Sequence, residues 1–199
     1  MVDLKNYLSP SPIIDCDHTD IVLAAKELAD TAGVHETALR CFEFVRDRIF
    51  HSYDFRMNPV TLKASEVLGH RTGYCYAKSH LLAALLRANG IPAGLCYQRL
   101  QLEEFGVHCL HGLNAVYLPD IGWYRMDARG NKEGVDAQFS PPVEQLAYRA
   151  DKKGEMTLPG IWAEPLPAIL DVLSKYDNYL DVRKNLPDIN PEIIPALRH

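Results

Sequence analysis

One change in the spacing of apolar residues, at Asn89-Gly90, constrains the fold of this chain more than any other feature. Before this point apolar residues recur three or four positions apart, as along one face of a helix, at Ala38, Leu39, Phe42, Val45 and Ile49. Asn89-Gly90 and then Pro92 end the helical pattern, because Gly favours a helix C-terminus and Pro cannot continue the helix. Strand-like segments separated by turn residues follow. Helices followed by an antiparallel meander indicate an α+β domain.

Individual elements can be predicted on either side of this change. The first part predicts helices over residues 21–30, 35–50 and 64–69, a loop over 52–59, and a helix that begins at Cys75 and ends at Asn89-Gly90. The second part predicts strands over residues 93–102, 111–118 and 122–126, with Pro119-Asp120-Ile121-Gly122 forming the turn of a hairpin. The pattern weakens after Asn131, where we expect helices near residues 142–150 and 165–173.

The length of 199 residues predicts one domain with a sizeable core. We expect this single domain to occupy residues 1–185. The segment that begins at Leu186 contains Pro187, Pro191 and Pro195, and proline removes backbone donors and stops helices. Residues 186–199 are therefore expected to run along the surface as an extended tail.

Charge and cysteine content narrow the possible partners and surroundings. The formal net charge of −5 argues against nucleic acid as a partner, and no run of basic residues supports a membrane surface. The N-terminus lacks the pattern of a secretory signal, and no apolar stretch is long enough to span a bilayer. Five irregularly spaced cysteines do not resemble a disulfide framework. We expect a cytoplasmic protein with reduced thiols, of unspecified oligomeric state.

Cys75 stands where the polar stretch Arg71-Thr72-Gly73-Tyr74 gives way to the apolar run over residues 81–86. A cysteine at that junction lies on the first turn of a helix, where unpaired N–H groups and the helix dipole stabilise a thiolate nucleophile. Its polar neighbours, Lys78 among them, distinguish it from most cysteines, which are small core residues. We expect such a core role for the other four: Cys16, Cys41, Cys96 and Cys109.

A cysteine nucleophile needs a base and a group that orients the base. His111 begins one predicted strand and Asp127 ends the next, so the two can face each other across neighbouring strands. We expect Asp127 to accept the Nδ1–H of His111, and His111 to take the proton of Cys75. His108 is a rival base, although its odd offset from His111 would turn it to the opposite face of a strand. The alternative for Asp127 is a turn residue before Ala128-Arg129-Gly130.

These residues resemble the transglutaminase-like superfamily, whose members are papain-like enzymes with a Cys-His-Asp triad. The resemblance covers roughly residues 13–130 and rests on an ordered set of segments: Gly73-Tyr74-Cys75, Leu86-Arg87-Ala88-Asn89-Gly90-Ile91-Pro92-Ala93, His111-Gly112-Leu113-Asn114-Ala115-Val116-Tyr117-Leu118-Pro119, and Gly122-Trp123 leading to Asp127. It implies a papain-like α+β fold in which Cys75 begins a central helix packed against the antiparallel sheet that carries His111 and Asp127.

Three positions depart from the pattern of that family. Leu113 stands where an aromatic residue is common, Ala115 where a glutamate is frequent, and Ala128-Arg129 where many relatives have Pro-Thr. These changes leave the three expected catalytic residues in place and alter the walls around them. The resemblance therefore implies a reaction type without implying a substrate.

The implied reaction is acyl transfer through a thioester on Cys75, which water or an amine then releases. The oxyanion would be held by the backbone N–H of Cys75 and by one further donor. Tyr53 is the leading candidate for that donor, with Gln98 and Tyr74 as rivals. We expect hydrolysis of an amide or peptide-type substrate, as by a cysteine protease or amidase, in preference to transglutaminase-type cross-linking.

Two other functions remain open at this stage. Arg71-Thr72-Gly73-Tyr74-Cys75 is similar to the cysteine loop of arylamine N-acetyltransferases, and relatives that have lost their triad serve as interaction modules on the same fold. No cofactor is expected, because nucleotide-binding glycine loops are absent. No metal is expected either, because His108, Cys109 and His111 are not joined by a second ligand pair at zinc spacing.

Overall fold

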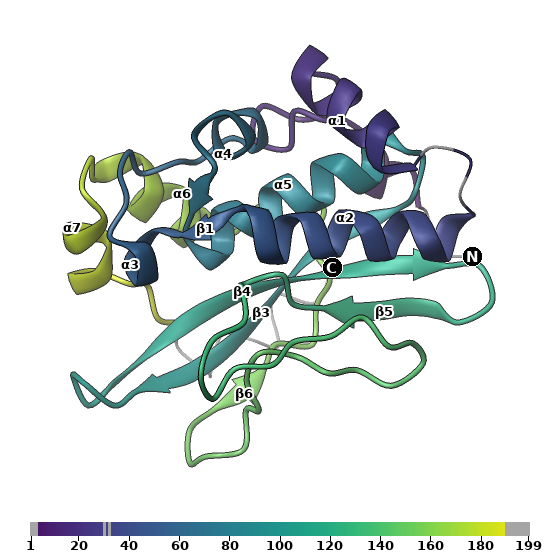
Figure 1. The fold of residues 1–199 in the computed structure, drawn as a ribbon. Coiled ribbons are helices and arrows are strands. Elements are labelled where there is room, and N and C mark those ends of the chain that lie inside the picture. The colour runs from purple at the N-terminus through teal and green to yellow at the C-terminus, as the bar shows by residue number, and fades with distance from the viewer. Residues whose placement is uncertain (1–3, 30, 32, 190–199) are drawn as a thin grey trace.

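In a computed structural model, which describes residues 4–29, 31 and 33–189, helices pack on one side of an antiparallel sheet (Figure 1). The α+β fold expected from the sequence is confirmed. The helices are the short 3-10 helix η1 (Lys5–Tyr7), α1 (Thr19–Ala29), α2 (Val34–Arg48), α3 (Ser52–Phe55), α4 (Ala64–His70), α5 (Cys75–Ala88), α6 (Pro167–Lys175) and α7 (Tyr179–Lys184). The strands are β1 (Phe50–His51), β2 (Thr72–Gly73), β3 (Ala93–Leu102), β4 (Val107–Leu118), β5 (Gly122–Met126) and β6 (Met156–Thr157).

The sheet has the strand order β5-β4-β3-β6, and its neighbouring strands are antiparallel. The β3–β4 hairpin is long, and its register places Gln98 opposite His111. The two short strands β1 and β2 form a separate parallel pair immediately before α5. This pair fixes the backbone that leads into Cys75.

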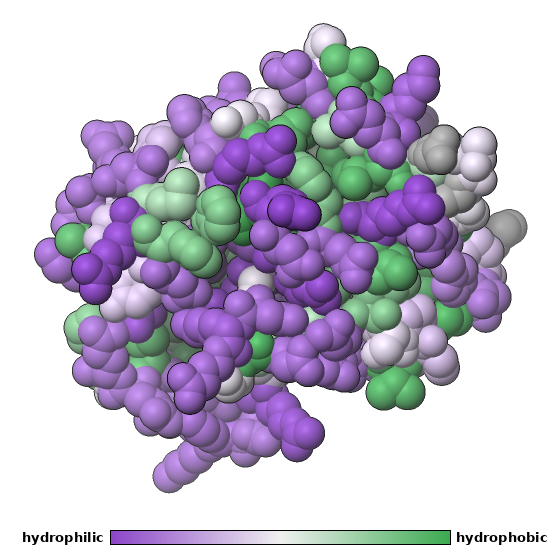
Figure 2. All heavy atoms as spheres, in the orientation of Figure 1, coloured by the Kyte–Doolittle hydropathy of each residue, from purple (hydrophilic) through white to green (hydrophobic). Residues whose placement is uncertain are grey.

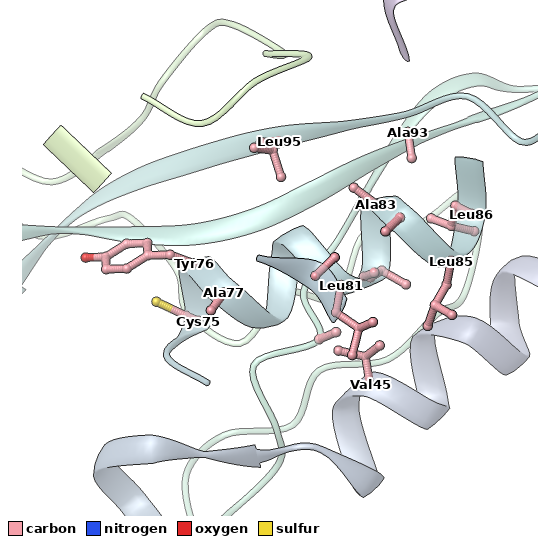
Figure 3. Packing of buried hydrophobic residues seen from close by; sticks show 14 of the residues in the cluster. Val45, Cys75, Tyr76, Ala77, Leu81, Ala83, Leu85, Leu86, Ala93 and Leu95 are labelled. Atoms are coloured by element: carbon pink, nitrogen blue, oxygen red, sulfur yellow. The ribbon is translucent and has the colours of Figure 1, made fainter. Parts of the chain in front are cut away.

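Helix α5 is the centre of the fold. Every residue from Cys75 to Arg87 is buried, because α1, α2 and α4 pack on one side of the helix and β3 and β4 on the other. Figure 3 shows Leu81 and Leu85 close to Val45 of α2, and all three side chains belong to one buried cluster. Burying a leucine side chain contributes roughly 1.5–3 kcal/mol, so this helix is a main source of stability.

The predicted elements of the central region agree closely with the structure. The expected strands 93–102 and 122–126 coincide with β3 and β5, and α5 begins at Cys75 as expected. Strand β4 begins at Val107, four residues earlier than expected, because the hairpin pairing continues to Leu102. The helix expected over 35–50 ends at Arg48, and Phe50 belongs to β1. Asp30, at the end of the first expected helix, lies outside the described residues.

Other expectations were wrong, chiefly after the sheet. The expected helix over 142–150 is an irregular segment, in which Gln138 and Gln145 form an isolated bridge and the backbone N–H of Ala147 donates to Asp127. These tertiary contacts hold the chain in a conformation that its local sequence does not specify. The expected loop over 52–59 contains the helix α3. The expected helix over 165–173 is present as α6, whereas α7 and β6 were not foreseen.

The beginning of the C-terminal segment lies against the sheet. The backbone N–H of Leu110 donates to Pro187 at 2.7 Å, and Arg99 forms two hydrogen bonds with Asp188 at 2.7 and 2.6 Å. The extended tail expected over residues 186–199 stays a prediction, because residues 190–199 lie outside the described part of the chain. The domain boundary expected at residue 185 stays a prediction.

The surface seen in Figure 2 is mainly hydrophilic, with apolar side chains in several separate patches, one of them near the position of α1. On α1, Val22 and Leu23 are exposed apolar residues. Among the described residues, no helix is both long enough and apolar enough to cross a bilayer. The expected cytoplasmic location stays a prediction.

Candidate active site

Cys75 is the first residue of α5, and Tyr74 is the N-cap with an extended backbone (φ −64°, ψ 164°). The backbone N–H of Cys75 therefore belongs to the first turn, whose N–H groups have no partner within the helix. The Cys75 residue is 8% exposed, and the backbone N–H of Gly112 on β4 lies 3.5 Å from its Sγ. This position provides the positive helix end that the sequence predicted for the thiol.

Gly112 permits the close approach of β4 to the start of α5. A Cβ at this position would lie 2.9 Å from Tyr76 Cδ1 and 3.1 Å from Tyr76 Cα, closer than a side chain can pack. The Tyr76 hydroxyl donates to the Leu110 carbonyl, which fastens the same two elements together. The sulfur of Cys75 is thereby held beside the strand that carries His111.

His111 and Asp127 are in direct contact. Their Nε2 and Oδ2 atoms are 2.7 Å apart, and Asp127, just after β5, is fully buried. Asp127 also accepts hydrogen bonds from the backbone N–H groups of Arg129 (3.1 Å) and Ala147 (3.2 Å). The expectation that Asp127 binds Nδ1 was wrong, because Asp127 lies where the distal nitrogen of the ring reaches it. Nδ1 is therefore the ring nitrogen that remains for a partner other than Asp127.

The surroundings of His111 favour its charged form. Burial alone would lower the pKa of His111, but the charge of Asp127 and the hydrogen bond to it, together with the neighbouring Cys75, raise it to about 10. Burial would likewise raise the pKa of Asp127, but His111 and the two backbone N–H groups lower it overall. A charged imidazole held by a buried carboxylate is the arrangement that a cysteine nucleophile needs of its base and orienting group.

A large cavity of about 1010 Å³ opens onto these residues. Its walls come from β1 and α3, the start of α5, the β3–β4 hairpin, residues 129–149 and the C-terminal segment around α7; both Cys75 and His111 line it. The Tyr148 ring packs edge-to-face on His111 with centroids 5.1 Å apart. Arg183 of α7 lies over the Tyr53 ring at 4.4 Å and pairs with Glu104 at 2.7 Å. The C-terminal segment thus contributes to the same cavity as the predicted nucleophile.

The three candidate oxyanion donors occupy different positions. Tyr53 lines the cavity beneath Arg183. Tyr74 also lines it, but its hydroxyl donates to the Tyr179 carbonyl at 2.6 Å. Gln98 is buried away from the cavity lining, and its amide donates to the Tyr148 carbonyl at 3.3 Å. Two of the three donors are therefore engaged within the protein, and the oxyanion role of each stays a prediction.

The rival base and the other cysteines are also located by the structure. His108 is not among the residues that line the cavity, and its Nε2 faces the Lys153 carbonyl at 3.4 Å. All five cysteines are free and buried. Cys109 lines the same cavity as Cys75, and burial raises its pKa to about 11. It serves as an internal comparison for Cys75.

Several polar residues near the site were not foreseen. Arg129 makes a two-pronged ion pair with Asp54 at 2.5 and 3.1 Å, and its guanidinium lies over the Tyr148 ring at 5.7 Å. Burial first, and then the charge of Arg129, lower the pKa of Lys78 to about 7, while its Nζ donates to the Ile49 carbonyl at 2.5 Å. These partners are far apart in the sequence, so no local pattern indicates that they meet.

Within the described residues, no group of three or more His, Cys, Asp or Glu side chains is placed to hold a metal ion.

Known proteins share this arrangement of elements. Residues 23–128 match the transglutaminase-like superfamily. A putative cysteine protease from Cytophaga hutchinsonii is similar in structure, with 21% identity and a TM-score of 0.54 over 65% of this chain and 43% of that chain. The periplasmic domain of TgpA from Pseudomonas aeruginosa matches with 19% identity and a TM-score of 0.47, over 62% of this chain and 45% of that chain. This chain thus matches less than half of the length of each of these two structures. No curated protein sequence matches this chain.

Proposed function

This chain belongs to the transglutaminase-like superfamily, and from that premise we propose that it hydrolyses an amide or peptide-type bond through a thioester on Cys75. The observation that carries the proposal is the 2.7 Å contact between Asp127 and His111, which lines the same cavity as Cys75. The contact supports the proposal that His111 serves Cys75 as base and that Asp127 orients it.

The first half of the reaction forms the thioester. The Cys75 thiolate attacks the acyl carbonyl, and the electron pair of the carbonyl moves onto its oxygen, next to the backbone N–H of Cys75. When the tetrahedral intermediate collapses, the C–N bond breaks and the His111 imidazolium gives its proton to the leaving amine. Asp127 holds the ring by Nε2 and stabilises the imidazolium until that transfer.

The second half releases the acyl group. Neutral His111 takes a proton from water in the cavity, the resulting hydroxide adds to the thioester carbonyl, and the C–S bond breaks to return the Cys75 thiolate and the His111 imidazolium. An amine that replaces water would be acylated in the same way. The partition between water and amine decides between hydrolysis and transamidation.

Activated esters test this proposal without knowledge of the natural substrate. Incubation with p-nitrophenyl acetate is expected to add one acetyl group to Cys75, seen by intact mass and peptide mapping, and then to release acetate repeatedly. Cys75→Ser should abolish both events, whereas Cys109→Ser, which alters another cysteine of the same cavity, should preserve them. Absence of acylation on Cys75 in the wild-type protein would overturn the proposal.

The same assay separates the alternative functions. Efficient acetylation of Cys75 by acetyl-CoA would favour an acetyltransferase, and transfer of the acetyl group to an added primary amine in preference to water would favour transamidation. A protein in which none of these reagents modifies Cys75 would be an interaction module.

A further inference from the structure

The short strand β1 brings a second histidine to the cavity. In the parallel β1–β2 pair, His51 lies beside Gly73, two residues before Cys75. His51 lines the cavity together with Cys75 and His111, and its ring packs edge-to-face against Tyr74 with centroids 5.3 Å apart. Since β2 leads directly into α5, His51 is placed by backbone pairing on the approach to the nucleophile.

The ring of His51 lacks the partners that buried polar groups normally have. It is 7% exposed, and its buried Nδ1 makes no hydrogen bond in the part of the chain that the structure describes. Nδ1 is enclosed by protein, and Asp54 Oδ2 is 3.7 Å from it, beyond hydrogen-bond reach. The Asp54 carboxylate is already bound by Arg129 at 2.5 Å and Lys132 at 2.9 Å. Nε2 is therefore the nitrogen left for a group in the cavity.

The charges around His51 keep its ring neutral. Burial, and then the cationic Arg129, Lys78 and His111, lower the pKa of His51 well below its usual range, against the opposing charge of Asp54. A neutral imidazole is poised to give a hydrogen bond without giving up its proton. It differs in this respect from His111, which holds the proton that the reaction moves.

We propose that His51 is a catalytic residue that donates its Nε2–H to the oxyanion formed when Cys75 attacks an acyl carbonyl. The inference rests on the proposed function and supplies the second donor beside the backbone N–H of Cys75. The hydroxyl of Tyr74 and the amide of Gln98 are engaged in protein hydrogen bonds, whereas His51 is free of them. An oxyanion in the cavity would give Nε2, the ring nitrogen that does not face Asp54, a hydrogen-bond partner.

Two reactions of the same sulfur distinguish this role from a structural one. Alkylation by iodoacetamide requires the thiolate but forms no oxyanion, whereas acylation by p-nitrophenyl acetate requires both. His51→Leu is expected to lower the acylation rate of Cys75 about 100-fold, the usual cost of removing an oxyanion donor. The alkylation rate should stay within about threefold of wild type. His51→Gln, which restores an N–H donor, should recover at least about tenfold of the lost acylation.

The controls separate the possible outcomes. His108→Leu alters a histidine of β4 outside the cavity lining and should change neither rate. If His51→Leu does not fold, as judged by circular dichroism, His51→Met makes the same comparison. Equal losses of acylation and alkylation, or no loss of either, would overturn the role of His51 while leaving the proposed function intact. A wild-type protein that p-nitrophenyl acetate does not acylate would instead overturn the proposed function.

Discussion

His51 and His111 are buried to nearly the same extent in the wall of one cavity, with 7% and 5% of their surfaces exposed, yet their surroundings favour opposite charge states. His111 touches the carboxylate of Asp127 at 2.7 Å, and its pKa rises to about 10. His51 has Arg129 and Lys78 as neighbours and no touching carboxylate, and its pKa falls. Burial lowers the pKa of both rings, so the nearest charged partner decides the result. Within one cavity wall, the ring of His51 is thus kept neutral and the ring of His111 charged.

The largest effect should come from Cys75→Ser. Cys75 and Asp127 both raise the pKa of His111, and this variant removes the thiol. We expect the rate of acylation by p-nitrophenyl acetate to fall at least about 1,000-fold, because a hydroxyl in this position is a far weaker nucleophile. The His111 pKa should also fall, as measured by NMR titration of the ring. An active Cys75→Ser variant would contradict the assigned nucleophile.

Asp127→Asn removes the carboxylate that His111 contacts. The pKa of His111 should then fall toward the lowered range of His51. Acylation is expected to slow by about 100- to 10,000-fold, since the amide neither stabilises the imidazolium nor fixes its tautomer. In the wild type, loss of the imidazolium at high pH should reduce the acylation rate through a pKa near 10. In Asp127→Asn, this decrease of the acylation rate should occur at lower pH. If the rate of Asp127→Asn decreased at the same pH as that of the wild type, Asp127 would not set the charge of His111.

Gly112→Ala should change the packing of β4, which carries His111, against α5. The β1 strand that carries His51 should keep its position. The added Cβ would press on Tyr76 at 2.9 Å and move the start of α5 away from β4. We expect about a tenfold loss of acylation and a free energy of unfolding reduced by about 1–3 kcal/mol, as for overpacked cores. Chemical denaturation and acylation rates measure the two effects. Wild-type values for both would show that the contact of β4 with α5 is not tight.

The smallest expected effect is on stability against pH, where the two histidines act with opposite signs. Because the folded pKa of His51 is lowered, the unfolded chain binds more protons below pH 6.5 and the protein loses stability as the pH falls. At pH 5 this loss reaches up to about 2 kcal/mol. His111, with its raised pKa, contributes stability that is full below pH 6.5 and lost as the pH rises through about 10.

Urea unfolding of the wild type, His51→Gln and His111→Gln at pH 5, 7 and 9 checks these signs. In His51→Gln, the free energy of unfolding should fall less between pH 7 and pH 5 than in the wild type. In His111→Gln, it should fall less between pH 7 and pH 9. His80 is also buried with its pKa lowered to about 4, chiefly by burial, so some acid sensitivity should survive in both variants. If the free energy of unfolding depended on pH in the same way in all three proteins, the opposite pKa shifts of His51 and His111 would be contradicted.

The sequence allowed good prediction of the part of the molecule whose signals are local. Asn89-Gly90 and Pro92 stop α5, and the alternating residues after them define β3 and β5 with their observed bounds. The position of Cys75 at the start of a helix, and the hairpin between His111 and Asp127, follow from the same local patterns. The roles of these residues stay predictions that the variants above test.

The rest could not be predicted because it depends on contacts between distant segments. Arg129 meets Asp54 and Arg183 meets Tyr53 only in the folded chain. Residues 137–150 have no helix, since Asp127 and Gln138 bind their backbone in another conformation. The choice of Nε2 over Nδ1 on His111 likewise depends on the placement of whole strands. His51 drew no attention in the sequence because its lack of hydrogen bonds is visible only in three dimensions.

The central claim is that His111 activates Cys75, and Cys109 offers the most direct comparison because both cysteines are 8% exposed in the same cavity. The measurement is the rate at which iodoacetamide alkylates each cysteine of the native protein at pH 7, followed by peptide mass spectrometry. We predict that Cys75 reacts at least about 100-fold faster than Cys109, because the thiolate is the reacting form, and that His111→Ala removes most of this difference. Equal rates for the two cysteines, or a Cys75 rate unaffected by His111→Ala, would contradict the account.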